Sequence, residues 1–289
     1  MSVFTLPSGR RLAYTLSAAA AAAASRPVVL LSNSICQDYS TWDRVVPVIE
    51  GLGYRVLRYD LPGHGGSSAP PSEHERATMT FETLADDVAL LLQHLAIPRL
   101  HAWIGDSMGG IKGVYFAARH PGVIHKLVVA DAIAGSPAAL GTPDVFGPRV
   151  AAAKAAGSMD QDLVQVGKRW LGDAWMAAHP DETARVQRAM ATTTVAGLET
   201  VCAALRSPDF DLRKVYLAAG RGCDAALIIV GEKDADLPTR MQAMRASLEE
   251  SLTAAGKPGP VAMEVIKQAG HVPYVDGFDQ FVAVLKKHL

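Results

Sequence analysis

The sequence predicts an α/β fold with a mostly parallel central sheet, helices on both faces of that sheet, and a helical cap inserted between two strands. Short apolar runs rich in Val, Ile and Leu alternate along the chain with longer segments of helical period. Continuous apolar runs are typical of parallel strands that are covered on both faces. Between Ala134 and Asp211 this alternation stops, because the segment contains helical patterns and no convincing strand.

Buried strands are predicted where the apolar runs are continuous. These runs cover residues 27–33, 54–60, 100–106, 125–131, 225–231 and 261–267. The segment before them, residues 2–17, contains two β-prone runs around a Ser-Gly turn and predicts a hairpin.

Helices are predicted between these strands and within the segment that lacks strands. In residues 81–96, Leu84, Val88 and Leu91 recur at steps of three or four residues and form one apolar face. The other core helices are predicted over residues 42–52, 108–120, 239–255 and 278–288. Those of the cap are predicted over residues 145–156, 161–171, 181–193 and 198–205.

The chain therefore divides into a core of residues 1–133 and 212–289 and a cap of residues 134–211. Ligands of open α/β sheets bind in the crevice outside the carboxyl ends of the strands. We expect the cap to lie over that crevice.

Composition excludes several classes of partner. The 289 residues carry a formal net charge of −1, so no basic surface favours nucleic acid or an anionic membrane. The three cysteines are widely spaced, which indicates a reducing, cytoplasmic location and no metal site. No segment approaches the ~20 apolar residues that span a bilayer. The alanine run at 18–24 imitates a secretory signal, but its low content of Leu, Val and Ile favours a loop extension.

The segment Gly105-Asp106-Ser107-Met108-Gly109 is the strongest chemical signal, because it lies between a predicted strand and a predicted helix. A direct turn from a buried strand into a helix strains the residue at its apex and leaves no space for side chains two positions away. The pattern G-x-S-x-G in this context is the nucleophile elbow. We therefore predict that Ser107 is a catalytic nucleophile.

A serine nucleophile needs a base and an orienting acid, in the chain order Ser, Asp or Glu, His. Asp234 follows a predicted strand at its carboxyl end, and His271 lies in a glycine-containing loop after the last strand. Both side chains are expected at the same edge of the sheet as Ser107. We predict that the three form a triad.

Other interpretations of these residues remain open at this stage. Ser107 could instead be the N-cap of the following helix. Asp236 and Asp131 are rivals of Asp234, while Asp106 as a nucleophile is disfavoured because it is not at the apex of the turn. Cys36 is interpreted as a packing residue. The cations Arg149, Lys168 and Arg169 fit a solvated helix face better than a site for a substrate carboxylate.

These motifs, in this order, resemble those of the α/β-hydrolase fold enzymes. The resemblance rests on "YDLPGHGGSS", "GDSMGG", "GEKDADLP" and "AGHVPYVD". Within that family, "LSNSICQDYSTWDRVVP" is similar to the 3-oxoadipate enol-lactonase branch, in which an Asn-Ser pair replaces the more common His-Gly. The elbow departs from that branch, which usually has Gly-Leu-Ser-Leu-Gly.

The resemblance also implies an oxyanion hole and a substrate pocket. The backbone N–H groups of Ile35 and Met108 would hold the oxyanion. Asn33 and Ser34 would shape the loop that presents Ile35 and would belong to the substrate pocket. In the cap, the aromatic side chains of Phe146, Trp170 and Trp175 either line the pocket or form the cap's own core.

We therefore expect a serine hydrolase that cleaves a small carboxylic ester or lactone through an acyl-enzyme, without metal or organic cofactor. The alternatives are an acyltransferase, thioesterase or lyase of the same fold, or a non-catalytic protein that binds a small molecule. The expected partner is a small-molecule ester or lactone. The sequence leaves open whether the protein forms a homo-oligomer.

Overall fold

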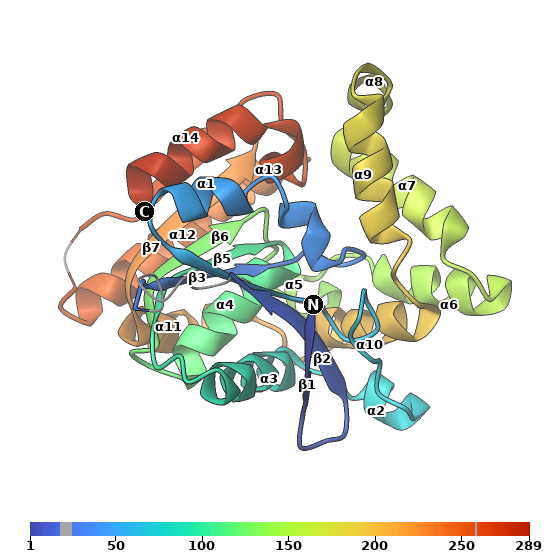
Figure 1. The fold of residues 1–289 in the computed structure, drawn as a ribbon, viewed down its shortest axis with the longest axis horizontal. Helices are drawn as coiled ribbons and strands as arrows, with labels where there is room; N and C mark the ends of the chain where they lie inside the picture. The colour runs from blue at the N-terminus through green and yellow to red at the C-terminus, as the bar shows by residue number, and fades with distance from the viewer. Residues whose placement is uncertain (18–24, 258) are drawn as a thin grey trace.

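A computed structural model describes residues 1–17, 25–257 and 259–289, and within them an eight-stranded sheet forms the centre of the molecule (Figure 1). The spatial order of the strands is β1-β2-β4-β3-β5-β6-β7-β8. Their bounds are β1 Ser2–Thr5, β2 Arg11–Leu16, β3 Val28–Ser32, β4 Arg55–Tyr59, β5 Leu100–Asp106, β6 Ile124–Ala130, β7 Cys223–Gly231 and β8 Ala262–Ile266.

The sheet is mostly parallel, as predicted. Strands β1 and β2 form an antiparallel hairpin, and β2 also pairs antiparallel with β4. Every other pairing, from β4–β3 to β7–β8, is parallel. The central strands are buried over most of their length, and β3 is buried at all of its positions. Continuous burial explains their unbroken runs of Val, Leu and Ile, because both faces of these strands contact helices.

Helices cover the two faces of the sheet. On one face α3, α4, α11 and α12 lie side by side, while α1 and α14 are neighbours on the other (Figure 1). Their bounds are α1 Val46–Gly51, α3 Phe81–His94, α4 Met108–Arg119, α11 Tyr216–Gly222, α12 Leu237–Ala254 and α14 Phe278–His288. The predicted α/β-hydrolase architecture is thereby confirmed.

Further helices lie between β6 and β7, and α6 to α9 project from one side of the sheet (Figure 1). They are α5 Pro137–Leu140, α6 Phe146–Ala156, α7 Asp160–Leu171, α8 Asp173–Ala178, α9 Pro180–Met190 and α10 Val195–Arg206. An antiparallel bridge joins Gly135 to Asp211 and brings the two ends of this segment together. The division into a core and a cap at residues 134 and 211 stays a prediction.

Short elements differ most from the expected ones. The predicted helix over 42–52 is a 3₁₀ turn, η2 Tyr39–Trp42, followed by α1, which has Pro47 in its first turn, where proline is tolerated. The short helices α2 Glu73–Ala77 and α13 Pro273–Asp276, and also α5, α8 and α11, were not predicted. None is long enough to repeat an apolar face. The predicted loop at 18–24 lies outside the described residues.

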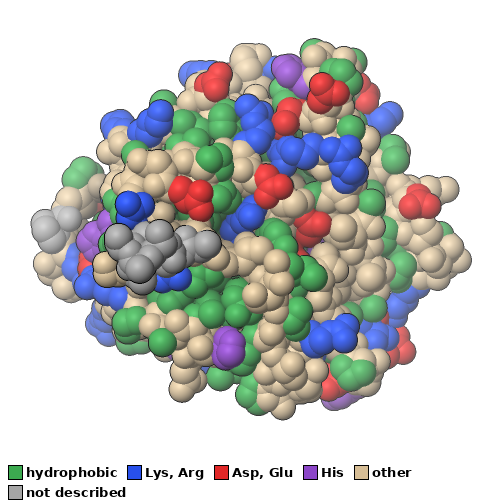
Figure 2. Space-filling model, viewed as in Figure 1, with side chains coloured by type: hydrophobic (Ala, Val, Ile, Leu, Met, Phe, Trp, Pro, Cys, Tyr) green, Lys and Arg blue, Asp and Glu red, His purple; other side chains and the backbone are tan. Residues whose placement is uncertain are grey.

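The surface carries both signs of charge. Figure 2 shows acidic and basic side chains interspersed over one face of the molecule. The three cysteines, Cys36, Cys202 and Cys223, are free and buried. Among the described residues, no helix combines the length and apolar character needed to cross a membrane.

Candidate active site

Ser107 stands at a strained turn between β5 and α4. Its backbone angles, φ 51° and ψ −114°, are ones that residues with a side chain rarely adopt. The turn is held on both sides, because the Ser107 N–H donates to the carbonyl of Ala130 over 2.7 Å and the Ile111 N–H donates to the carbonyl of Ser107 over 3.0 Å. Such strain persists only where the surroundings enforce it, and it is common at functional sites.

The flanking glycines are required by close contacts of the backbone. A Cβ atom on Gly105 would lie 2.2 Å from the carbonyl of Gly109, and one on Gly109 would lie 2.0 Å from the carbonyl oxygen of Ser32 in β3. No side chain fits at such distances. The indole Nε1 of Trp103 donates to the Gly109 carbonyl over 2.9 Å and fixes the start of α4 against the sheet.

The hydroxyl of Ser107 is not used as a helix cap. In α4 the Ser107 side chain makes no capping hydrogen bond. It lines a cavity of about 480 Å³ instead. Ser107 thus stands at the N-cap position of α4, but its hydroxyl does not cap the helix and is left for another role.

Asp234 and His271 meet at the same cavity. Nδ1 of His271 donates to Oδ2 of Asp234 over 2.6 Å, and both side chains line the cavity together with Ser107. Their side chains are only 15% and 14% exposed. A largely desolvated carboxylate that accepts from Nδ1 fixes the imidazole tautomer that leaves Nε2 as a proton acceptor.

The loops that carry the acid and the histidine are joined through their backbones. The Lys233 N–H donates to the carbonyl of Ala269 over 2.8 Å, and the His271 N–H donates to the carbonyl of Trp170 in α7 over 3.1 Å. The ring of Trp170 also lies 5.4 Å from that of His271, centroid to centroid. The histidine is thus positioned by β7, by β8 and by a helix of the inserted segment.

Asp131, a rival of Asp234, and Asp106, the disfavoured alternative nucleophile, both lie in the interior. Asp106 and Asp131 are fully buried, and Oδ1 of Asp131 accepts from the Gly231 N–H over 2.8 Å. Burial raises the pKa of both carboxyls well above the usual range, and the charge of Asp234 raises both pKa values further. Both groups therefore favour the neutral form, and Asp234 is the carboxyl group that contacts the histidine.

Two amides are free to donate at the position expected for an oxyanion hole. Ile35 lines the cavity, and Met108 is the first residue of α4. Within the described part of the chain, neither N–H has an acceptor. Unpaired amides at a helix start and in the facing loop are the usual donors to a developing oxyanion.

The loop of Ile35 is fixed by His64. Nε2 of His64 accepts from the Cys36 N–H over 3.2 Å, while Nδ1 donates to the carbonyl of Pro62 over 2.9 Å. Burial of the ring lowers the pKa of His64 to about 4. The neutral imidazole therefore connects the Pro62–His64 turn to Cys36, whose own backbone has a φ of 58°.

The residues predicted for the substrate pocket separate into three groups. Phe146 lines the cavity. Trp170 lies behind His271, and Trp175 stacks on His179 outside the cavity. Asn33 and Ser34 do not line it either: Asn33 is buried and its Oδ1 accepts from the Trp42 indole over 2.8 Å.

Several cavity-lining residues were not predicted, among them Ile133, Leu140, Val145, Leu205, Leu237 and Arg240. Arg149 and Arg169 also line the cavity, so their assignment to a solvated helix face is wrong, whereas Lys168 is 48% exposed. They come from distant segments of the chain and share no motif. Only the packing of the inserted helices on the core brings them together.

Comparison with known proteins identifies the family of this chain. Residues 27–278 match the family model described as the alpha/beta hydrolase fold. The chain belongs to the α/β hydrolase fold family.

Relatives and solved structures extend this family assignment. The chain is 27% identical to 3-oxoadipate enol-lactonase 2 of Acinetobacter baylyi, over 73% of each chain. A hydrolase from Pseudomonas aeruginosa superposes with a TM-score of 0.81 and 30% identity, over 99% of this chain and 97% of that one. The enol-lactonase from Burkholderia xenovorans gives a TM-score of 0.78 and 27% identity, over 99% and 98%. The family and these relatives support a hydrolase of esters or lactones.

Proposed function

We propose that the protein is a serine hydrolase that cleaves a small carboxylic ester or lactone through an acyl-enzyme. Nε2 of His271 takes the proton of the Ser107 hydroxyl as the oxygen attacks the carbonyl carbon. Asp234 holds the imidazole in the required tautomer and stabilises its positive charge. The N–H groups of Ile35 and Met108 donate to the oxyanion.

The second half of the cycle releases the acid. The imidazolium of His271 returns its proton to the leaving alkoxide, which departs as the alcohol; in a lactone this alcohol stays attached to the acyl chain. Water then donates a proton to His271 and attacks the acyl carbon, and the Ser107 oxygen leaves as the restored hydroxyl. The imidazole of His271 thus carries the proton in both halves of the cycle.

One observation carries the proposal: the 2.6 Å hydrogen bond from His271 to Asp234 lies at the cavity that the strained Ser107 also lines. A nucleophile, a base and an orienting acid at one cavity are the set that acyl transfer requires. The apolar side chains around them suit the carbon chain of an acyl group.

The proposal is tested with p-nitrophenyl esters of increasing acyl length beside γ- and δ-lactones. We expect turnover of at least one class by the wild-type protein, and the loss of that turnover in Ser107→Ala. Hydrolysis that survives Ser107→Ala would contradict the assigned nucleophile. Absence of turnover with every ester and lactone would contradict the proposed activity.

A further inference from the structure

Lys112 is a buried cation that the proposed mechanism does not use. It lies on α4, one helical turn after Met108, and is only 1% exposed. Burial lowers the pKa of Lys112 to about 7, because the ammonium group loses its hydration in the interior. Lysine is rarely buried unless it is paired. Apolar packing alone therefore gives no reason for a lysine at this position.

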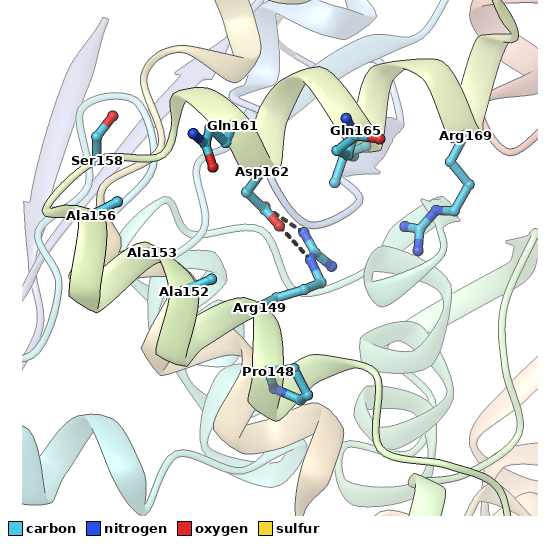
Figure 3. A pocket seen from close by; sticks show the side chains of 11 residues that line it. Pro148, Arg149, Ala152, Ala153, Ala156, Ser158, Gln161, Asp162, Gln165 and Arg169 are labelled. Atoms are coloured by element: carbon cyan, nitrogen blue, oxygen red, sulfur yellow. Dashed lines mark hydrogen bonds and ion pairs between the residues drawn. The ribbon is translucent and has the colours of Figure 1, made fainter.

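Lys112 and Arg149 are both largely buried cations, but their partners differ. Arg149 in α6 contacts both carboxylate oxygens of Asp162 at 2.7 Å (Figure 3). Within the described residues Lys112 forms no ion pair, and Asp87, whose charge acts on Lys112, pairs with Arg10 over 2.7 Å instead. A buried charge without an ion-pair partner is costly. The hydrogen bonds of the ammonium group therefore indicate what Lys112 does.

The ammonium group of Lys112 connects to strand β3 through a tyrosine of β4. Nζ of Lys112 donates to Oη of Tyr59 over 2.7 Å and lies 4.5 Å from the centre of the Tyr59 ring. The same Oη is hydrogen-bonded to Oγ of Ser32 over 2.8 Å. All three side chains are buried. They form a continuous chain of hydrogen bonds from α4 to β3.

This chain joins the two segments that carry the amides of the proposed oxyanion hole. Ser32 is the last residue of β3 and precedes Ile35 by three residues. Lys112 follows Met108, the other donor, by one turn of α4. The two segments also touch at Gly109, where a Cβ atom would lie 2.0 Å from the Ser32 carbonyl oxygen. The hydrogen bonds thus fix the segment of Ile35 relative to that of Met108.

The charge of Lys112 also acts on His64, which fixes the loop of Ile35. Nε2 of His64 accepts from the Cys36 N–H over 3.2 Å, and it can do so only when the imidazole is neutral. Burial lowers the pKa of His64, and the positive charge of Lys112 lowers this pKa further. The ammonium group therefore favours the form of His64 that holds the loop.

We propose that Lys112 is a positioning residue that holds the two amides of the oxyanion hole in place, through Tyr59 and Ser32. This inference rests on the proposed function, because the amides act only when an oxyanion forms. Lys112 is not among the described residues that line the catalytic cavity. Its loss should therefore weaken the stabilisation of the transition state and leave the binding of the substrate unchanged.

The kinetics of Lys112→Met and Tyr59→Phe test this role with an ester that the wild-type protein cleaves. Both substitutions keep the size of the side chain and remove the hydrogen bond between the two residues. In each variant kcat should fall about 5- to 30-fold, less than for a missing oxyanion donor, while KM changes by less than about twofold. The double variant should lose no more activity than the weaker single variant, because both substitutions break the same chain.

Two control variants separate this role from a general loss of stability. Tyr115→Phe, also on α4, removes a hydroxyl that donates to the carbonyl of Asp209 over 3.3 Å, and Lys286→Met changes an exposed lysine of α14. Neither should alter kcat by more than about twofold. Lys112→Met should unfold at a urea concentration no lower than that of the wild type, because methionine fills the space without a buried charge.

A lysine with a merely structural role would give the opposite pattern. The urea midpoint of Lys112→Met would fall, and kcat would stay at the wild-type value. If Lys112→Met does not fold, Tyr59→Phe provides the same test, because it removes the hydroxyl that links Lys112 to Ser32. An unchanged kcat in folded Tyr59→Phe would refute the positioning role.

Hydrogen exchange of the Cys36 N–H, measured by NMR, separates this inference from the proposed function. In Lys112→Met the bond from this N–H to His64 should open more often, so exchange should be about 10-fold faster than in the wild type. If esters are cleaved but Lys112→Met and Tyr59→Phe change neither kcat nor this exchange rate, the positioning role is refuted while the hydrolase stands. If no ester is cleaved but the exchange rate depends on Lys112, the activity fails and the positioning of the loop stands.

Discussion

The turn at Ser107 and the inserted helices α6 and α7 line the same cavity but follow different constraints. At the turn, a Cβ atom at position 105 or 109 would lie only 2.2 or 2.0 Å from backbone atoms, so glycine alone fits there. In α7, a Cβ atom on Gly167 would meet nothing within 4 Å, and Val164 is 50% exposed. At the turn, the surrounding backbone determines which residue type fits. In α6 and α7, the contacts of each side chain determine it.

The residues proposed for the reaction and the residues that shape the cavity therefore lie in different parts of the fold. The residues that we propose as reacting groups, Ser107, Asp234 and His271, stand on loops of the sheet, which hold them in one geometry. Arg149 and Arg169 stand on the inserted helices, where we expect a substitution to change the cavity and to leave the backbone unaffected. We expect changes at the turn to abolish activity or folding, and changes in the inserted helices to alter the choice of substrate.

The largest expected effect is that of Ser107→Ala. Removal of the nucleophile should lower kcat/KM by about 10⁴-fold or more. The free energy of unfolding should change by less than about 1 kcal/mol, since alanine is as strained as serine at this backbone conformation. Initial rates and urea denaturation of the same preparation check both statements. A variant that retains a tenth of the wild-type rate would remove Ser107 from the mechanism.

Asp234→Asn comes next. An asparagine would favour the wrong imidazole tautomer, so kcat should fall by about 10⁴-fold. Asp236→Asn is the matched control: Asp236 is 62% exposed and pairs with Arg240, and its change should alter kcat by less than about threefold. A larger loss in Asp131→Asn than in Asp234→Asn would transfer the orienting role to Asp131.

A pair of glycine substitutions compares the two regions directly. Gly109→Ala should destabilise the fold by about 3 kcal/mol or more, because its methyl group would overlap the Ser32 carbonyl. Gly167→Ala, with open space around the new methyl group, should stabilise it by up to about 1 kcal/mol. Chemical denaturation measures both changes. Equal changes in the free energy of unfolding for the two substitutions would mean that the contact with the Ser32 carbonyl does not require glycine at position 109.

The smallest effect concerns His64 and pH. Burial lowers the pKa of its ring in the folded state from 6.5 to about 4, so the folded protein binds this proton less readily than the unfolded chain. Stability should therefore fall as pH decreases from 6.5 to 4. Over this pH range the free energy of unfolding of the wild type should fall by up to about 3 kcal/mol more than that of His64→Gln.

Urea denaturation at several pH values measures this difference. His74→Gln, at an exposed position of α2, should follow the wild-type curve. Parallel curves for the wild type and His64→Gln would show that His64 titrates as it does in the unfolded chain.

Much of the core could be predicted from the sequence because each signal there is local. The run of residues 100–106 matches β5 at both ends, and glycine flanks Ser107 because the nearby backbone leaves no space for a side chain. The position of Asp234 and His271 at one sheet edge follows from parallel topology. By contrast, Arg149 and Arg169 were interpreted as residues of a solvated face. Their approach depends on how α6 and α7 pack, which no periodicity encodes.

Labelling with phenylmethylsulfonyl fluoride tests the central assignment most directly. The account predicts one sulfonyl adduct by intact-protein mass spectrometry, located at Ser107 by peptide mapping, with activity lost in proportion to labelling. The adduct should not form in Ser107→Ala or when His271 is replaced by alanine. An adduct on another residue, or full activity in fully labelled protein, would contradict the account.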